Sequence, residues 1–256
     1  QIDLDALAVA LDHPHVAMVS LTHVPIQSGL VNPAAAVGAL CREAGVLFVI
    51  DACQSAGQLP LDVAELGCHV LTGTGRKFLR GPRGTGFLFV QRELALQLEP
   101  IVLDMAAATW VAPNRYELQP DARRFEQWEA DVAARIGLGV AVTQALEWGL
   151  DAIAARTAVL AADLRTRLTE IPGVVVRDRG ERLCAITSFT VNGRSAEAVR
   201  AQLHDQGVNV ATSVATSAQL DLPHRGLDAV VRASVHYVTT EAELARFAAL
   251  VTQIAT

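Results

Sequence analysis

The sequence has a single lysine, Lys77, among its 21 basic residues, and all the others are arginines. It has no apolar run close to the ~18–20 residues that a membrane-spanning helix needs. It also has no basic tract longer than a few residues, and its net charge is −6. Binding to a nucleic-acid backbone requires clustered positive charge. We therefore expect neither a membrane-spanning segment nor a nucleic-acid partner.

Cysteines are few, and none has the CxxC or CxH spacing of a zinc site. They stand in apolar segments, at Cys41, Cys53, Cys68 and Cys184. This pattern fits reduced thiols in the cytoplasm better than a disulfide framework, and the first residues lack the basic and apolar regions of a signal peptide. The seven histidines are scattered among acids without metal-ligand spacing, so we expect no metal.

The chain is long enough for one sizeable core plus a smaller second one. Apolar runs predict strands near residues 16–21, 46–50, 70–72 and 87–90. A helix is predicted between the first two, with Asn32 as its N-cap and Pro33 in its first turn. Apolar strands alternating with helices are typical of a parallel sheet that is covered on both faces.

From residue 126 the pattern becomes helical, and after residue 172 it returns to short strands and helices. We expect two long helices, followed by a compact α+β region with strands near 174–176, 185–191, 208–211 and 230–235 and helices near 196–206 and 241–254. The predicted organisation is a large domain at 1–125, connecting helices at 126–170 and a C-terminal α+β domain at 171–256.

Polar residues gather where two predicted strands end. Asp51 ends the second strand, and the third is followed by a loop rich in Gly, Thr and Arg that contains Lys77. Ligands of open parallel sheets bind outside the carboxyl ends of the strands. Small residues and arginines in such a loop suit a phosphate group. An exposed basic loop without a ligand is an equally good interpretation of the composition alone.

The stretch VLFVIDACQSAGQLPLDVAELGCHVLTGTGRKFLRGPRGTGFLF, at residues 46–89, resembles the pyridoxal-phosphate (PLP) signature of the class V aminotransferases. That signature is D-A-x-Q-S-x-G-x-x-P-x-D followed by S-G-H-K and a Gly-rich turn. The family includes cysteine desulfurases, selenocysteine lyase and isopenicillin N epimerase. The resemblance implies a fold-type I PLP-dependent transferase, with a three-layer α/β large domain, a smaller C-terminal α+β domain and a homodimeric assembly.

Five residues match the family's cofactor positions. The resemblance implies that Lys77 bonds covalently to the PLP aldehyde and then carries the Cα proton. It implies that Asp51 pairs with the pyridine nitrogen and that Gln54 bonds the phenolic oxygen. Thr74 and Arg76 stand where the family has a phosphate-binding serine and histidine.

Arg232 matches the arginine that binds the α-carboxylate of an amino-acid substrate; the alternative is a strand-end arginine paired with a nearby acid. The family lysine usually falls well past the middle of the large domain. Because Lys77 comes early, we expect an N-terminal part with further phosphate contacts to be missing from this chain and the cofactor site to be incomplete.

The sequence departs from the cysteine desulfurases in ways that favour another substrate. A desulfurase needs a cysteine in the loop where this chain has Thr216, and no cysteine follows Cys184. The family's R-F-E-x-G-T is replaced by RFEQWE at residues 124–129, and Ile26 stands where an asparagine is frequent.

The chain is similar to the C–S lyases of ergothioneine biosynthesis. These cleave hercynylcysteine sulfoxide by β-elimination to ergothioneine, pyruvate and ammonia, without a protein thiol. Trp110, Tyr116 and Trp128 are candidates to bind the trimethylammonium group of that substrate, although core or interface packing is the commoner role of such residues. The alternatives are an aminotransferase or an isopenicillin N epimerase-like enzyme acting at Cα, and a non-catalytic binding protein on the same fold.

Overall fold

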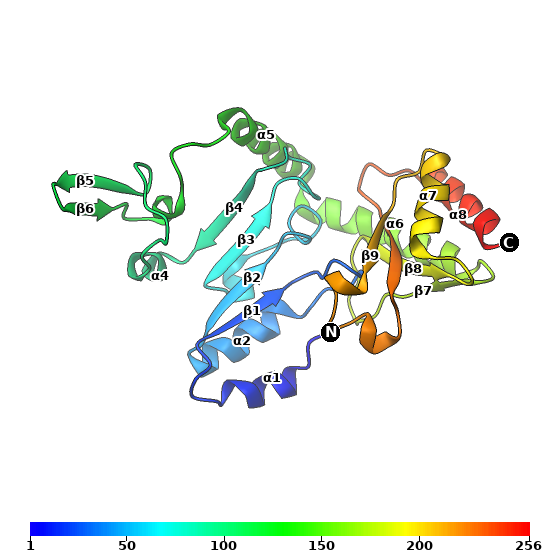
Figure 1. The fold of residues 1–256 in the computed structure, drawn as a ribbon, viewed down its shortest axis with the longest axis horizontal. Helices are drawn as coiled ribbons and strands as arrows, with labels where there is room; N and C mark the ends of the chain where they lie inside the picture. The colour runs from blue at the N-terminus through cyan, green and yellow to red at the C-terminus, as the bar shows by residue number, and fades with distance from the viewer.

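The computed structural model describes all 256 residues and contains two four-stranded sheets, one in each half of the chain (Figure 1). The first sheet has the order β1-β2-β3-β4. Its strands are β1 (Met18–Thr22), β2 (Leu47–Asp51), β3 (Val70–Thr74) and β4 (Gly86–Val90). β1, β2 and β3 pair in parallel, whereas β4 pairs with β3 antiparallel. The four predicted strands are confirmed. The predicted parallel pairing holds for β1 to β3, whereas β4, which is joined to β3 by a loop without a helix, runs antiparallel.

Three helices accompany the first sheet: α1 (Leu4–Leu11), α2 (Ala34–Ala44) and α3 (Val63–Leu66). α2 ends at Gly45, which takes the left-handed conformation (φ 67°) favoured by glycine. The prediction that Asn32 caps this helix is wrong. Its side chain instead donates to the carbonyl of Thr22 and accepts from the amide of Ile2, so it ties the end of β1 to the start of the chain.

One face of the first sheet is buried and the other is largely open. Alternate strand residues pack with α2 into a core that includes Leu21, Phe48, Ile50 and Leu71, because side chains on a strand alternate between faces. On the opposite face Met18 is 54% and Leu88 45% exposed. We expected helices to cover both faces of this sheet. In the chain they cover one face only, since no helix packs over Met18 and Leu88 on the other.

Between the sheets the chain forms α4 (Arg92–Gln97), β5 (Ala108–Ala112), β6 (Arg115–Leu118), η1 (Ala122–Phe125), α5 (Val132–Trp148) and α6 (Leu150–Thr169). The two long helices agree with the sequence. The β5–β6 hairpin was not predicted; it projects away from the body at the left of Figure 1. No helix is long and apolar enough to cross a membrane.

The second sheet has the order β7-β8-β10-β9, with every pair antiparallel. Its elements are β7 (Val174–Val176), β8 (Ile186–Val191), α7 (Ala196–Asp205), β9 (Ala211–Val214), η2 (Ala215–Ser217), η3 (Pro223–Arg225), β10 (Ala229–Ser234) and α8 (Glu241–Ala255). β9 begins at Ala211, three residues later than predicted. Val208 is still part of the turn that ends α7, because its amide donates to the carbonyl of Leu203.

A buried carboxylate joins the two halves. Asp178, whose side chain is 1% exposed, pairs with Arg165 at 2.8 Å. It also accepts from the amide of Gly29 and from the amide and hydroxyl of Ser188. Gly29 lies in the loop after β1, and a Cβ there would stand 2.3 Å from the carbonyl oxygen of Ile186, so only glycine allows this approach. The loop after β1 is thereby held against β8.

Replacing Asp178 with alanine is expected to lower the free energy of unfolding by about 3–5 kcal/mol, because it leaves the largely buried Arg165 guanidinium without its counter-charge and the donors of Gly29 and Ser188 without their acceptor. Asp163→Ala is the matched control: it removes a half-exposed ion pair with Arg167, for which we expect less than about 1 kcal/mol. Urea denaturation of the two variants measures both values. Equal losses would contradict a role for Asp178 at the junction.

Candidate active site

The carboxyl ends of β1, β2 and β3 lie at the same edge of the first sheet, because the three strands are parallel. Asp51 is the last residue of β2 and Thr74 the last residue of β3. The Asp51 carboxylate accepts from the amide of Cys53 at 2.8 Å, which turns the chain sharply after the strand and fixes the carboxylate at the sheet edge.

The loop after β3 is closed by its own backbone. The amide of Gly81 donates to the carbonyl of Gly75 at 2.7 Å, so the segment that contains Lys77 forms a compact turn. Gly57 packs against this turn: its φ is +89°, and a Cβ there would stand 2.6 Å from the amide nitrogen of Leu79. Both the backbone angle and the close approach require glycine at residue 57.

Lys77 lines a pocket of about 340 Å³ that is built from four separate parts of the chain. They are the loop after β1, the loop after β2, the Lys77 loop, and β10 with the turn that follows it. The lining residues are Ile26, Gln54, Arg76, Lys77, Phe78, Arg232, Ser234, Val235 and His236. Four predicted site residues therefore meet in one pocket, although 178 residues separate Gln54 from Arg232.

Burial lowers the pKa of the Lys77 ammonium below its usual value. The neighbouring guanidinium groups of Arg76 and Arg232 act in the same direction, whereas Cys53 and the Asp51 carboxylate partly oppose them. The net effect favours the neutral amine, which is the form that attacks an aldehyde or accepts a proton.

Arg232 points to the loop after β1. One of its terminal nitrogens donates to the carbonyl of Ile26 at 2.8 Å, and its Nε is buried without a partner. Arg232 forms no ion pair with an acidic side chain. The alternative interpretation, in which it is a strand-end arginine paired with a nearby acid, therefore does not match the structure. A half-buried guanidinium with an unpartnered Nε is suited to a carboxylate ligand.

Two predicted residues lie just outside the pocket. Asp51 does not line it but is close enough for its charge to act on Lys77. Thr74 does not line it either, and its hydroxyl lies 3.4 Å from the carbonyl of Thr85, a long hydrogen bond.

The sequence model of the class V aminotransferases matches residues 1–247. The chain belongs to this family. A probable hercynylcysteine sulfoxide lyase from Mycobacterium tuberculosis is 34% identical over 250 residues, which cover 97% of this chain and 60% of that protein. A probable cysteine desulfurase from Methanothermobacter thermautotrophicus is 27% identical over 231 residues, covering 89% of this chain and 58% of that protein. The family resemblance found in the sequence is confirmed.

Solved structures confirm the predicted α/β fold class, that of the fold-type I transferases. The apo cysteine desulfurase from Thermococcus onnurineus NA1 superposes with a TM-score of 0.92 at 24% identity, covering 100% of this chain and 63% of that one. The cystine C–S lyase C-DES, in complex with its product cysteine persulfide, superposes with a TM-score of 0.86 at 25% identity, covering 98% and 65%. This class V aminotransferase chain spans about three-fifths of the length of such relatives.

Other residues at the site have no assigned role in the sequence motif. Cys53 occupies the variable position of D-A-x-Q and lies beside Asp51 and Lys77. Burial and the Asp51 carboxylate raise the pKa of its thiol, so it is a poor nucleophile near neutral pH. The sequence motif around Lys77 was the available signal for Cys53 and Phe78. The signal for His236 was its position four residues after Arg232, which allowed either a place in the site or a structural role, and the structure puts it in the pocket wall.

The three aromatic candidates for a trimethylammonium site do not line the pocket. Trp110 and Tyr116 lie on the projecting hairpin, where they are 77% and 44% exposed, and Trp128 is 62% exposed. Within the chain itself, none of them contributes to a ligand-binding wall around Lys77.

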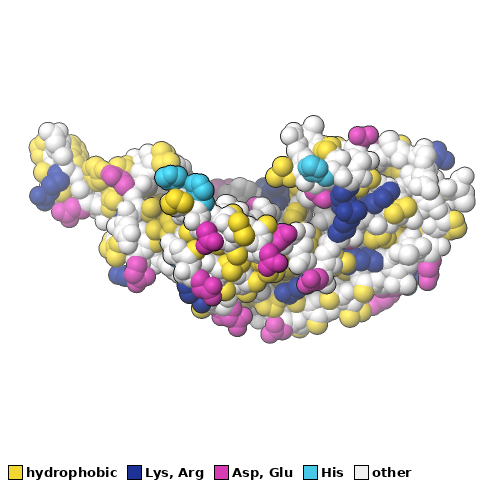
Figure 2. All heavy atoms as spheres, turned by 90° about the horizontal axis from the view of Figure 1, so that it is seen from below, with side chains coloured by type: hydrophobic (Ala, Val, Ile, Leu, Met, Phe, Trp, Pro, Cys, Tyr) yellow, Lys and Arg dark blue, Asp and Glu magenta, His cyan; other side chains and the backbone are white.

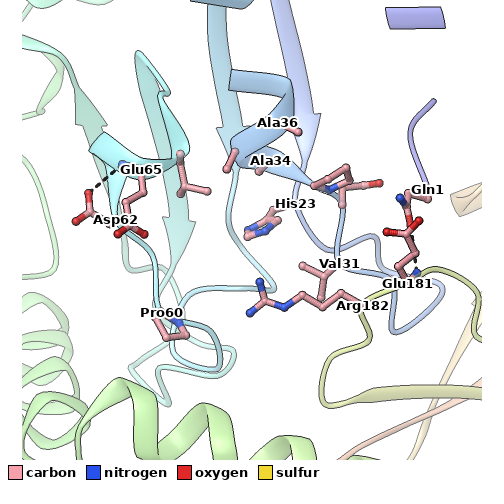
Figure 3. Close-up of a pocket in the computed structure, with 14 residues that line it drawn as sticks. Gln1, His23, Val31, Ala34, Ala36, Pro60, Asp62, Glu65, Glu181 and Arg182 are labelled. Atoms are coloured by element: carbon pink, nitrogen blue, oxygen red, sulfur yellow. Dashed lines mark hydrogen bonds between the residues drawn. The ribbon is translucent and has the colours of Figure 1, made fainter. Parts of the chain in front are cut away.

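A second pocket, of about 360 Å³, lies on the side of α2 and the loop that precedes β8. Figure 3 shows His23 at its centre, between Arg182 and the first turn of α2. His23 is 4% exposed, and its Nδ1 has no hydrogen-bond partner. Burial, together with the charge of Arg182, lowers the pKa of His23 to about 4.

Because the folded state disfavours the protonated form, His23 should reduce stability as pH falls from about 6.5 to about 4. In that window the unfolded chain takes up a proton that the folded chain rejects, and the loss is of the order of 3 kcal/mol. Denaturant unfolding at pH 7 and pH 4.5 should show a smaller pH effect in His23→Gln than in wild type. The exposed His204→Gln serves as control, and an unchanged pH effect in His23→Gln would refute the assignment.

Proposed function

We propose that this chain is the lysine-bearing part of a PLP enzyme. Lys77 supplies the amine that bonds covalently to the aldehyde of the cofactor, and it is the only side-chain amine in the sequence. Its position in the pocket and its lowered pKa support this role. The pocket also offers Gln54, Arg76 and the buried free donor of Arg232, so the residues present fit a small anionic cofactor with an amino-acid substrate.

The remaining contacts follow from the sheet edge. We propose that Asp51 pairs with the pyridine nitrogen and that Gln54 bonds the phenolic oxygen. We propose that Thr74 and Arg76 bind the phosphate, together with the loop amides. When bound, PLP draws electrons away from Cα of the substrate. Arg232 holds the α-carboxylate through two parallel hydrogen bonds, and the Lys77 amine accepts the Cα proton.

We propose that the reaction is C–S bond cleavage by β-elimination from a cysteine S-conjugate or sulfoxide. The observation that carries this proposal is the location of the thiols. The loop after β9 has Thr216 where a desulfurase needs its sulfur-accepting cysteine. Cys184 is 3% exposed, and burial raises its pKa to about 11. A leaving sulfur fragment is therefore released rather than held as a protein persulfide.

The specific substrate that we propose is hercynylcysteine sulfoxide. The support is the relative of that name at 34% identity, together with the absence of a loop cysteine. Elimination releases an aminoacrylate, which water hydrolyses to pyruvate and ammonia. The sulfur fragment leaves as a sulfenate, which two molecules of a small thiol reduce to ergothioneine with formation of their disulfide and water.

We further propose that residues 1–125 belong to the cofactor-binding large domain, 126–170 are connecting helices and 171–256 form the C-terminal domain. Two separate core clusters, one around each sheet, support this division. Four free cysteines fit a reducing compartment such as the cytoplasm.

The full-length protein, reconstituted with PLP, should release pyruvate and ammonia in equal amounts from a cysteine sulfoxide without any keto-acid acceptor. Lys77→Ala should reduce the rate at least about 1,000-fold, because the proton acceptor is lost. Arg83→Ala, an exposed arginine of the same loop that does not line the pocket, is the control. A strict need for a keto-acid acceptor would indicate transamination, and racemised substrate would indicate epimerisation; either result rejects elimination.

We also propose that the protein is a homodimer and that the projecting hairpin lies in its interface. Figure 2 shows hydrophobic side chains at this end of the molecule, with basic and acidic groups beside them. The projecting surface consists of Ile101, Val102, Met105, Trp110 and Trp128, each more than half exposed. Isolated exposed apolar residues are common, but such a group on one projection is typical of an interface.

Sedimentation equilibrium of the full-length protein should give a dimer. Trp110→Ser should weaken dimerisation at least about 10-fold, because it removes a large aromatic contact. Val159→Ser, on α6 and 64% exposed, should leave the dimer unchanged. A monomeric wild type, or equal effects of the two substitutions, would contradict the proposed interface.

A further inference from the structure

Two consecutive residues after β10 contact the loop that contains Lys77. The Nε2 of His236 lies 3.0 Å from the carbonyl oxygen of Phe78, the residue that follows Lys77. A carbonyl only accepts, so Nε2 must carry the hydrogen. The imidazole also stacks on the ring of Phe78, with centroids 5.8 Å apart and planes inclined by 11°. This is the single hydrogen bond of the His236 side chain, since its buried Nδ1 has no partner.

The next residue holds the far end of the same turn. Arg80 donates to the hydroxyl of Tyr237 at 3.1 Å, and its guanidinium lies 5.8 Å from the centre of the tyrosine ring. Arg80 is the single non-glycine residue of the chain with positive φ, at 62°. A side chain in this conformation is unfavourable and persists where its surroundings hold it. Trp148 packs on the other side of Tyr237, with ring centroids 5.8 Å apart.

These contacts bind the Lys77 loop to the second half of the chain. The side chain of Phe78 is 8% exposed and belongs to the core cluster of the second sheet, not to that of the first. His236 contacts Phe78, one residue after Lys77, and Tyr237 contacts Arg80, three residues after Lys77. Arg232 lies on β10, the strand that leads into this turn, four residues before His236.

We propose that His236 and Tyr237 are positioning residues that set the distance between the Lys77 amine and the carboxylate-binding Arg232. This inference rests on the proposed function of those two residues. Because β10 and its following turn carry both Arg232 and the two contacts to the loop, any shift of β10 that accompanies carboxylate binding moves the Lys77 loop with it. The two groups that must act on one amino acid, at its carboxylate and at its Cα, therefore move together.

The test uses full-length protein with three substitutions. His236→Phe keeps a stacked ring and removes the donor, His236→Gln restores a donor on a flexible chain, and Tyr237→Phe removes the hydroxyl. Val238→Ala is the matched control, because Val238 is the next residue, is 56% exposed and does not line the Lys77 pocket.

The first readout needs no cofactor. Lys77 is the only lysine of this chain, so the rate of its reductive methylation can be followed by mass spectrometry of the peptide that contains it. We expect this rate in the cofactor-free protein to rise at least about threefold in His236→Phe and Tyr237→Phe, with His236→Gln closer to wild type, because a released loop exposes the amine. The thermal unfolding midpoint should stay close to wild type.

The second readout uses the PLP-loaded protein. We expect kcat to fall about 10-fold or more in His236→Phe and Tyr237→Phe while KM changes less, because a misplaced amine slows proton transfer without removing the carboxylate contact. Unchanged Lys77 labelling and unchanged kcat in both variants would overturn the inference. A fall in thermal midpoint with unchanged labelling would also overturn it, since that result indicates a merely structural role.

The outcomes separate this inference from the proposed function. If wild-type protein leaves no pyridoxyl group on Lys77 after borohydride reduction, the cofactor proposal fails. If wild type forms that adduct and the variants match it in labelling rate and in kcat, only the positioning role of His236 and Tyr237 fails.

Discussion

Parallel pairing of β1, β2 and β3 is the constraint on which the rest of the structure depends. It brings the ends of three strands to one edge, so residues that are far apart in the sequence share one pocket. The sharp turn at Asp51 and the closed loop at Gly75–Gly81 then keep their side chains at that edge. The second half of the chain completes the pocket from outside, because β10 and its turn lie against the Lys77 loop.

The sequence predicted most of the core elements because their signals are local. Continuous apolar runs identified β1 to β4 to within a few residues. Lys77 stood out by composition, and the motif around it supplied Asp51, Gln54 and Arg76. The structure places Gln54, Arg76 and Lys77 in one pocket with Arg232, which lies on a strand of the other sheet.

What the sequence did not predict depends on long-range contacts. The antiparallel direction of β4 is set by its pairing with β3, and its apolar run carries no sign of direction. Asn32 has the chemistry of an N-cap, but its side chain instead binds Thr22 and Ile2. The contact of His236 with Phe78 joins residues 158 positions apart, and nothing in either local pattern indicates it. The β5–β6 hairpin is short, exposed and without clean alternation, so no periodicity marked it.

The use of arginine at every basic position except Lys77 has a chemical consequence for the surface of the chain. A guanidinium keeps its proton at any physiological pH and does not condense readily with carbonyl compounds, whereas a primary amine does. The surface of this chain thus offers no competing side-chain amine on which a reactive aldehyde could be trapped. The composition of the chain, and not only the shape of its pocket, therefore directs an aldehyde to Lys77, because this is the only side-chain amine of the chain and it lies where the strand ends converge.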